Sequence, residues 1–335
     1  MSKYLSLFVF PVLSALALKL TFGNLMEAGM QPYIEQNCPP LPTSAQPHRL
    51  NYTGFDSVDG AICGLVYFFH LALTPDVLPF LTYFMGNFMP LAALLSFESF
   101  RQGRHPLLAF PVVFGLLMQV MTVGAKTPIY WLIFILTGAA QRQVDGPKTT
   151  ITSAHAQSVA FGLFIGAVVP TVCLVVLEDS HVTAIWQLFP LWQYLAQSAH
   201  LLVCPASTHK ESGYPWVQAL YIAAFVFGSS VHVGTLAKAN TLEGVKAALM
   251  PSLNSLNSAP PHLKVKDFLQ WDAFFGFSST LLATLWFAEN ASQIMVIALW
   301  NIFASVLLGP GAAIAAIALW RESNLHRSSP KEKSQ

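Results

Sequence analysis

The fold class is decided by residues 292–320, which read SQIMVIALWNIFASVLLGPGAAIAAIALW. This stretch contains no Asp, Glu, Lys or Arg. A helix needs roughly 20 mostly apolar residues to cross the roughly 30 Å hydrocarbon core of a bilayer. Residues 292–320 therefore predict helical structure inside a membrane, and Gly309-Pro310-Gly311 is the place within them that hints at a break.

The same composition extends over the whole chain. Of its 335 residues, 54% are hydrophobic and 10% are charged, whereas an ordinary soluble domain has about 25% charged residues. The sequence therefore predicts an all-α fold, a polytopic transmembrane helical bundle of about 8–10 spans. Residues 127–140 are apolar but short and predict a tilted helix or a re-entrant segment. The other apolar windows are 4–22, 60–75, 77–97, 106–125, 158–177, 182–204, 214–237 and 273–288.

The windows predict one helical membrane domain over residues 1–320. Two polar stretches are expected outside the membrane: the proline-rich 23–57, interpreted as an extended loop, and 239–271, which can hold a short amphipathic helix. The tail 321–335 is charged and is expected to be disordered. The first window has a small-residue Ala15-Leu16-Ala17 motif like a signal-peptide cleavage site, but its apolar character continues, so we expect an uncleaved first helix.

The orientation of the bundle stays open. Basic residues are most easily reconciled with nine spans and the N-terminus outside, provided that 127–140 does not cross. Asn51-Tyr52-Thr53 matches the acceptor motif for N-glycosylation. A glycan at Asn51 would place the first loop in the lumen and argue for the reverse orientation. We expect an integral membrane protein of the endoplasmic reticulum.

Several classes of function are disfavoured. The net charge of +1 gives no reason to expect a nucleic-acid partner. No HExxH motif, clustered histidines, nucleotide-binding glycine loop or serine nucleophile elbow is present, so we expect no metal site. The four cysteines lack metal or redox spacing and are interpreted as small core residues. They are Cys38, Cys63, Cys173 and Cys204.

Polar side chains inside the apolar windows locate the interior of the bundle, because exposing them to lipid costs free energy. At helical spacing they fall on single faces. The faces hold Asp59, Cys63, Tyr67 and His70 in the second window, Tyr83, Asn87, Leu94, Glu98 and Arg101 in the third, Gln193, Gln197 and His200 in the seventh, and Asp272, Phe275, Ser279 and Trp286 in the ninth.

Each of these faces also has a purely structural interpretation. Asp59 is placed to act as an acid at the start of a helix. Glu98 and Arg101 stand at i, i+3 and can form an interfacial ion pair. Asp272 can cap a helix beside an interfacial tryptophan, the glutamines can bond neighbouring helices, and His232 can be a packing residue.

The acids also suggest a chemical interpretation. Asp59, Glu98 and Asp272 are expected near helix ends, close to turns rich in aromatic and methionine side chains. A carboxyl group in an apolar setting keeps its proton more readily than in water and can act as a general acid. Aromatic faces can stabilise a cation. An apolar pocket with acids at its rim suits carbocation chemistry on a lipid-like substrate.

Four stretches carry a resemblance to a known family. They are Asp59–Phe69, read DGAICGLVYFF; Phe97–Gly103, read FESFRQG; Phe110-Pro111 with Phe114–Leu117 and Gln119; and Phe189–Trp192, read FPLW. Together they resemble the fungal membrane-bound terpene cyclases of the ascofuranone and macrophorin pathways, over most of the chain.

The resemblance implies cyclisation of a farnesyl chain carried by an aromatic or epoxyquinone polyketide, in meroterpenoid secondary metabolism. The partners implied are a lipophilic prenylated aromatic substrate and membrane lipid. The reaction would be an isomerisation started by protonation of a terminal alkene or epoxide, with no cofactor. The absence of a DDxxD motif agrees with this, since that motif would hold magnesium in a cyclase that ionises a diphosphate.

The site residues are assigned from the face analysis alone. Glu98 is the first candidate for the proton donor, with Arg101 and Gln119 positioning it, and Asp59 and Asp272 are the other candidate acids. The residues expected to line the pocket are Tyr67, His70, Asn87, Tyr130 and Trp216.

Two other classes remain open from the sequence. A small transporter or exporter of the same metabolite would share the apolar windows and the inward polar faces, although no internal repeat is visible. A sterol-isomerase-like membrane enzyme would also protonate an alkene with a buried acid. It differs in the shape of its substrate, which the sequence does not reveal.

Overall fold

The computed structural model describes residues 1–40, 46–141, 151–254 and 256–327. The described residues are helical apart from short connections and one isolated bridge between Thr152 and Ser212, which confirms the all-α prediction. The longer helices of the first half are α1 Lys3–Leu18, α4 Asp56–Ala72, α5 Leu78–Ser99, α6 Pro111–Met121, α7 Val123–Leu136 and α8 Ser153–Leu163. Those of the second half are α9 Val169–Leu177, α11 Phe189–Val203, α12 Tyr214–Ala239, α14 Pro261–Thr284, α15 Ala291–Leu307 and α16 Pro310–Arg327.

Among the described residues, four helices are long and apolar enough to cross a membrane. They are Lys3–Glu27, which joins α1 to the short α2 (Asn24–Glu27), α5, the continuous Ser153–Leu177 built from α8 and α9, and α12. Helices α1 and α2, like α8 and α9, are joined by one π-helical turn (Lys19–Gly23 and Phe164–Val168). The count of eight to ten spans stays a prediction.

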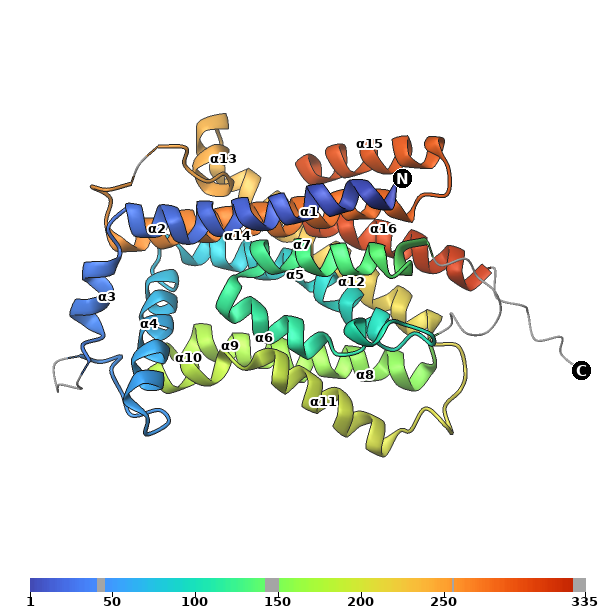
Figure 1. Cartoon of the computed structure of the whole chain (residues 1–335), viewed down its shortest axis with the longest axis horizontal. Helices are drawn as coiled ribbons and strands as arrows, with labels where there is room; N and C mark the ends of the chain where they lie inside the picture. The colour runs from blue at the N-terminus through green and yellow to red at the C-terminus, as the bar shows by residue number, and fades with distance from the viewer. Residues whose placement is uncertain (41–45, 142–150, 255, 328–335) are drawn as a thin grey trace, which may run out of the picture.

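Most helices run along the long axis of the molecule, but α4 lies across one end of it (Figure 1). The short helix α3 (Gln31–Asn37) lies beside α4 at the same end, and the start of α1 and the end of α16 lie toward the opposite end. Helix α4 contacts both α10 (Ser180–Trp186) and α14. At this end of the bundle the helices therefore cross one another, whereas elsewhere most of them pack side by side.

Helices α6 and α7 form a hairpin whose turn is the single residue Thr122 (Figure 1). They span about 16 Å and 21 Å at 1.5 Å per residue, so each is shorter than the hydrocarbon core. Helix α7 packs against α1 and α14. The segment 127–140 is thus the returning arm of a hairpin whose tip lies inside the bundle, in agreement with the re-entrant alternative.

Residues 292–320 form two helices and not one. Helix α15 ends at Leu307, Gly309 adopts a φ of 94°, and Pro310 opens α16. Glycine tolerates a positive φ, and proline is favourable in the first turn of a helix because its missing N–H has no partner there. The chain can therefore turn sharply, and α15 packs against α16.

The two expected loops and the tail hold more helix than predicted. Residues 23–57 contain α2 and α3, so the interpretation as an extended loop is wrong for them. Within 239–271 the expected short helix is found at α13 (Leu242–Leu249), but α14 already begins at Pro261. The first part of the tail continues α16 to Arg327, because Arg321 and Glu322 are buried in the bundle. Residues 328–335 lie outside the described residues.

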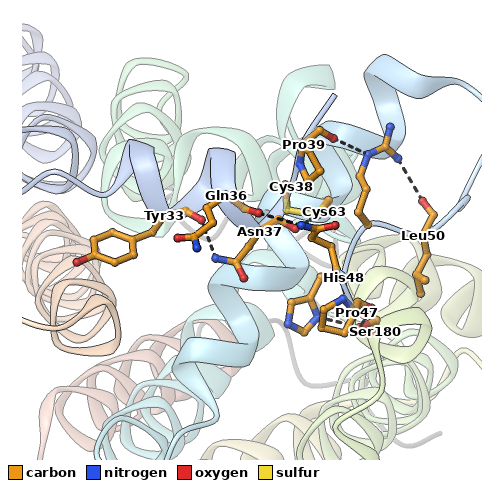
Figure 2. The surroundings of a disulfide bond; sticks show 12 residues. Tyr33, Gln36, Asn37, Cys38, Pro39, Pro47, His48, Leu50, Cys63 and Ser180 are labelled. Atoms are coloured by element: carbon orange, nitrogen blue, oxygen red, sulfur yellow. Dashed lines mark hydrogen bonds between the residues drawn. A yellow bond between two sulfur atoms is a disulfide. The ribbon is translucent and has the colours of Figure 1, made fainter. Parts of the chain in front are cut away.

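Two of the four cysteines are not simple core residues. Cys38, just after α3, forms a disulfide with Cys63 in α4 (Figure 2). Arg49 strengthens the same region by donating to the backbone oxygens of Pro39 and Pro40. The prediction that all four cysteines are core residues is therefore wrong for this pair, while Cys173 and Cys204 are unpaired.

Candidate active site

An apolar cavity of about 270 Å³ lies where α4 crosses the bundle. Its volume is close to the lower end of the range of about 300–1,000 Å³ usual for small-molecule sites. The N-terminal helix, α4, α5, α6 and α14 all contribute to its walls. Among the described residues that line it, Asp272 is the only acidic one, with Gln119 and Thr122 as polar neighbours. Its aromatic lining consists of Phe22, Phe68, Phe69, Phe84, Phe88, Trp186, Phe189 and Phe268.

Asp272 is anchored to the tip of the α6–α7 hairpin. The backbone N–H of Gly124 donates to Asp272 Oδ1 at 2.5 Å, and that of Val123 donates to Oδ2 at 3.4 Å. These groups are the first amides of α7, which have no partner inside their own helix. The positive end of the α7 dipole thus points at a carboxylate that is 5% exposed.

The turn that presents these amides has an unusual backbone. Thr122 has φ 72° and ψ 164°, a region that is essentially restricted to glycine and costs about 1–3 kcal/mol for other residues. Its hydroxyl accepts a hydrogen bond from the Ala125 N–H and so caps α7. Strain of this kind is typical of functional sites, and here it directs the amides of Val123 and Gly124 at Asp272.

Close packing leaves no space between the hairpin and α14. A Cβ added to Gly124 would lie 2.8 Å from the backbone oxygen of Asp272 and 3.0 Å from its Oδ1. Only glycine lets the hairpin approach the carboxylate so closely. Lys126, also buried, lies beyond ion-pair distance of Asp272 but attracts it electrostatically.

Aromatic rings surround the space in front of Asp272. Phe268 stands one helical turn before Asp272, and its edge meets the rings of Phe22 and Phe68 at centroid distances of 5.2 and 5.0 Å. Phe69, whose ring also contacts that of Phe68, packs edge-on against Trp186 at 4.7 Å. The negative faces of such rings can stabilise a cation that forms in the cavity.

Glu98 has a different environment. Its Oε1 accepts hydrogen bonds of 2.5 Å from both Arg101 and Arg321, and Arg101 also pairs with Glu322. The ion pair expected between Glu98 and Arg101 is confirmed, and it is buried. Glu98 and Arg101 do not line the cavity of Asp272. The two glutamates and two arginines instead join α5 to α16.

Asp59 lies in the first turn of α4 and binds the loop before it. It accepts hydrogen bonds from the Thr53 amide, the Thr53 hydroxyl and the Gly54 amide. Burial raises the pKa of Asp59, but these hydrogen bonds lower it further, so that the pKa falls below its ordinary value. Asp59 does not line the cavity either, so the three acids are not gathered at one rim.

The other predicted site residues are dispersed. Gln119 and Asp272 both line the apolar cavity. Tyr67 and His70 face the loop histidine His48, and Asn87 accepts from the Gly311 amide. Tyr130 lies in an aromatic cluster with Phe114, Trp131 and Phe134, and Trp216 is 46% exposed on α12. The catalytic and binding roles of all ten residues stay predictions.

Sequence reasoning missed the hairpin tip. The signal was present in Thr122–Lys126, where a glycine and a lysine interrupt two apolar segments. It was hidden because the segment does not resemble any known ligand motif. The arginine of α16 was missed because the tail was interpreted as disordered.

Comparisons with known proteins identify two relatives named as terpene cyclases. Terpene cyclase ascI of Acremonium egyptiacum is 27% identical over 241 residues, which cover 67% of this chain and 62% of that protein. The match therefore spans less than two thirds of the ascI chain. Terpene cyclase ctvD of Aspergillus terreus (strain NIH 2624 / FGSC A1156) is 24% identical over 353 residues, covering 95% of this chain and 99% of the relative.

A third relative has a different name. FAD-dependent monooxygenase verC1 of Penicillium polonicum is 21% identical over 257 residues, 72% of this chain but 32% of that protein. No solved structure matches the chain. The expected resemblance to fungal meroterpenoid cyclases is confirmed. The CtvD domain matches residues 5–325, and the chain therefore belongs to the CtvD-domain family.

Proposed function

We propose that this protein is a membrane-bound terpene cyclase that folds the prenyl chain of a farnesylated aromatic polyketide in fungal meroterpenoid biosynthesis. The observation that carries the proposal is the placement of Asp272, a single carboxyl group on the wall of an aromatic cavity, bonded to two backbone amides. The names of the relatives ascI and ctvD support the same activity.

In the proposed reaction, the carboxyl group of Asp272 gives its proton to the terminal epoxide oxygen of the prenyl chain. The C–O bond breaks as the nearest internal alkene attacks the carbon and a C–C bond forms. The final carbocation loses a proton to a base, so the product is an isomer of the substrate and no redox partner takes part. The amides of Val123 and Gly124 are already aimed at the carboxylate that forms, which is the arrangement expected of electrostatic catalysis.

The aromatic walls serve the later steps. As the positive charge moves along the folded chain, it passes rings such as Phe68, Phe268 and Trp186, whose faces attract a cation. The same walls exclude water, which would otherwise trap the cation as an alcohol. Gln119, a polar residue in the same lining as Asp272, is suited to orient the epoxide oxygen.

An epoxide is favoured over an alkene as the group that is protonated. The relative verC1 is named as an FAD-dependent monooxygenase, and only 32% of it matches this chain. Flavin monooxygenases insert one oxygen atom into their substrates, and an alkene gives an epoxide. A cyclase-like segment within such a protein agrees with oxidation followed by cyclisation.

We propose the endoplasmic reticulum as the location.

The proposal can be tested with microsomes from yeast that express the full chain. We expect a farnesyl-phenol with a terminal epoxide to give a cyclic isomer of unchanged mass, detected by chromatography and NMR. Asp272→Asn removes the acidic proton, and we expect kcat/KM to fall by about 10²–10⁴-fold, the usual contribution of a general acid. Asp56→Asn is the matched control, since its side chain is 75% exposed and far from the cavity lining.

Two results would contradict the proposal. If neither the epoxide nor the farnesyl-phenol without it is converted by membranes in which the folded protein is detected, the enzyme assignment is wrong. If the substrate is converted equally well by Asp272→Asn, the acid has been assigned to the wrong residue. Conversion of the alkene but not of the epoxide would overturn the preference for an epoxide.

A further inference from the structure

A second cavity lies against the same helix as the first. Its volume is about 320 Å³, and it lies between α14, the end of the N-terminal helix and residues 252–254 and 256. In contrast to the cavity of Asp272, it has polar side chains on several sides, including Asn24, Lys264 and the two acids Glu27 and Asp267. Leu253, 90% exposed, marks the outer edge. We call it the polar cavity.

Lys264 is the most unusual residue of the polar cavity. The lysine is 3% exposed, yet no carboxylate among the described residues lies within ion-pair distance of its Nζ. Its recorded neighbour is the ring of Tyr33, 5.0 Å from Nζ to the centroid. A buried charge without a partner is costly. A ligand oxygen that is anionic or a strong hydrogen-bond acceptor would supply such a partner to Lys264 in the polar cavity.

Trp271 adds an unsatisfied donor to the same lining. It is 7% exposed, and its indole Nε1 is buried without a hydrogen-bond partner in the described part of the chain. Buried polar atoms are nearly always hydrogen-bonded in folded proteins. Asp267, by contrast, already accepts a hydrogen bond of 2.6 Å from the Ser252 amide. Lys264 and Trp271 thus offer two donors in the described lining that a ligand oxygen can meet.

The two cavities are separated by a wall one side chain thick. Phe268 and Leu25 line both of them. Lys264, Phe268 and Asp272 follow one another at intervals of four residues and so form one row along α14. Eight residues of helix place the first and last of the row about 12 Å apart. A ligand with a polar group at Lys264 can extend past Phe268 and reach Asp272.

We propose that the polar cavity binds the oxygenated aromatic head of the substrate, while the prenyl chain passes Phe268 and Leu25 into the cavity of Asp272. This inference rests on the proposed function and adds the substrate class that the site selects: a prenylated ring with an acidic or carbonyl oxygen for Lys264. Rotation of the Phe268 ring joins the two cavities. Binding of the aromatic head fixes how deeply the prenyl chain enters the cavity of Asp272. It thereby holds the terminal epoxide of the prenyl chain at the carboxyl group.

The test compares two substrates with the same chain and terminal epoxide. One carries a phenol ring and the other a benzene ring without oxygen. With Lys264→Met we expect KM for the phenol to rise about 10–100-fold, the range for loss of a hydrogen bond to a charged group. We expect KM for the benzene analogue, and kcat for both, to stay near the wild-type values. Lys266→Met is the matched control, because Lys266 does not line the polar cavity.

The outcomes separate this inference from the proposed function. If the wild-type protein converts neither substrate, the proposed function fails. If it converts both but Lys264→Met changes them equally or not at all, the inference about the head is wrong and the function stands. Thermal unfolding in detergent checks that the variant is folded. As a second variant, Phe268→Trp is expected to narrow the passage and to lower conversion of both substrates.

A lipid head group shares the chemistry that Lys264 requires, so the assay includes a lipid comparison. The protein is placed in nanodiscs of phosphatidylcholine alone or with added phosphatidylserine. We expect the effect of Lys264→Met on the phenol to be the same in both. Loss of the effect in phosphatidylcholine, together with weaker lipid retention by the variant, would identify a lipid as the occupant and overturn the proposal.

Discussion

Glu98 and Asp272 are both buried carboxylates on long helices, but their partners differ in kind. Glu98 is held by the guanidinium groups of Arg101 and Arg321 and borders no part of the apolar cavity. Asp272 has no cation within ion-pair distance among the described residues, is held by backbone amides, and lines the cavity.

This difference separates a structural acid from a candidate catalytic one. A carboxylate between two arginines strongly favours its ionised form and gives up its hydrogen-bonding capacity to them. Amide dipoles neutralise a charge less completely, so a carboxyl group at the α7 terminus can exist in both protonation states during a reaction. The residue that sequence analysis placed first, Glu98, has the less suitable environment for proton donation.

The largest expected effect is on stability, from Glu98→Gln. Removing the charge leaves Arg101 and Arg321 buried with one negative partner, Glu322, and loss of one partner of a buried pair costs about 3–5 kcal/mol. We expect a clearly lower midpoint of thermal unfolding in detergent, while kcat for the folded fraction is retained. If kcat falls as far as in Asp272→Asn and the unfolding midpoint is unchanged, the distinction between the two acids is lost.

The second effect is on activity, from Gly124→Ala. The new Cβ would lie 2.8 Å from the Asp272 backbone oxygen, so the hairpin and α14 must separate. A displacement of about 1 Å at a catalytic group can lower the rate about hundredfold, which we expect in kcat. Gly60→Ala is the matched control, because its Cβ meets nothing within 4 Å. Equal kcat in both variants would show that the hairpin does not position Asp272.

The smallest effect is expected from Asp59→Asn. Asp59 is also held by amides but does not face the cavity, so it tests whether amide contacts alone make an acid catalytic. We expect kcat/KM to be unchanged. A loss of activity like that of Asp272→Asn would show that access to the cavity is not what matters.

Asp59 also has a predictable effect on the pH dependence of stability. Hydrogen bonds place its folded pKa below the ordinary value of 3.8 despite burial, which acts in the opposite direction. The stabilisation is therefore complete above about pH 3.8 and is lost as the pH falls through the lower folded value. We expect the wild type to be slightly more stable than Asp59→Asn at pH 7, and the difference to shrink at pH 3. The unfolding midpoints of the two proteins measure it.

The sequence predicts the helical class because apolar runs of this length have few alternatives. It also placed Asp272 and Gln119 among the candidate site residues, since inward-facing polar residues in apolar windows are few. Both residues line the apolar cavity. It did not predict which acids share a space. That depends on where α4 crosses the bundle and where the α6–α7 hairpin turns, and both follow from long-range packing that a helical period does not encode.

The incomplete predictions have different causes. Residues 292–320 form one apolar window, in which Gly309-Pro310-Gly311 only hinted at the break that their backbone preferences produce. The tail looks disordered because charged residues usually face water, and Arg321 is buried only because Glu98 lies opposite it. The first cause is a local backbone property, whereas the partner that buries Arg321 is far away in the sequence.

The disulfide between Cys38 and Cys63 bears on the sidedness of the protein in its membrane. Structural disulfides persist in oxidising compartments and are rare where glutathione keeps thiols reduced. We therefore expect the end of the bundle formed by α3 and α4 to face the oxidising side, together with the exposed Asn51 in the loop between them. The start of α1 and the end of α16 lie toward the opposite end (Figure 1), which we therefore expect on the reducing side. For the end of α16 this agrees with counting basic residues, but it places the N-terminus on the opposite side from that count, as a glycan at Asn51 would. It would also give each end of the proposed substrate path its own redox environment.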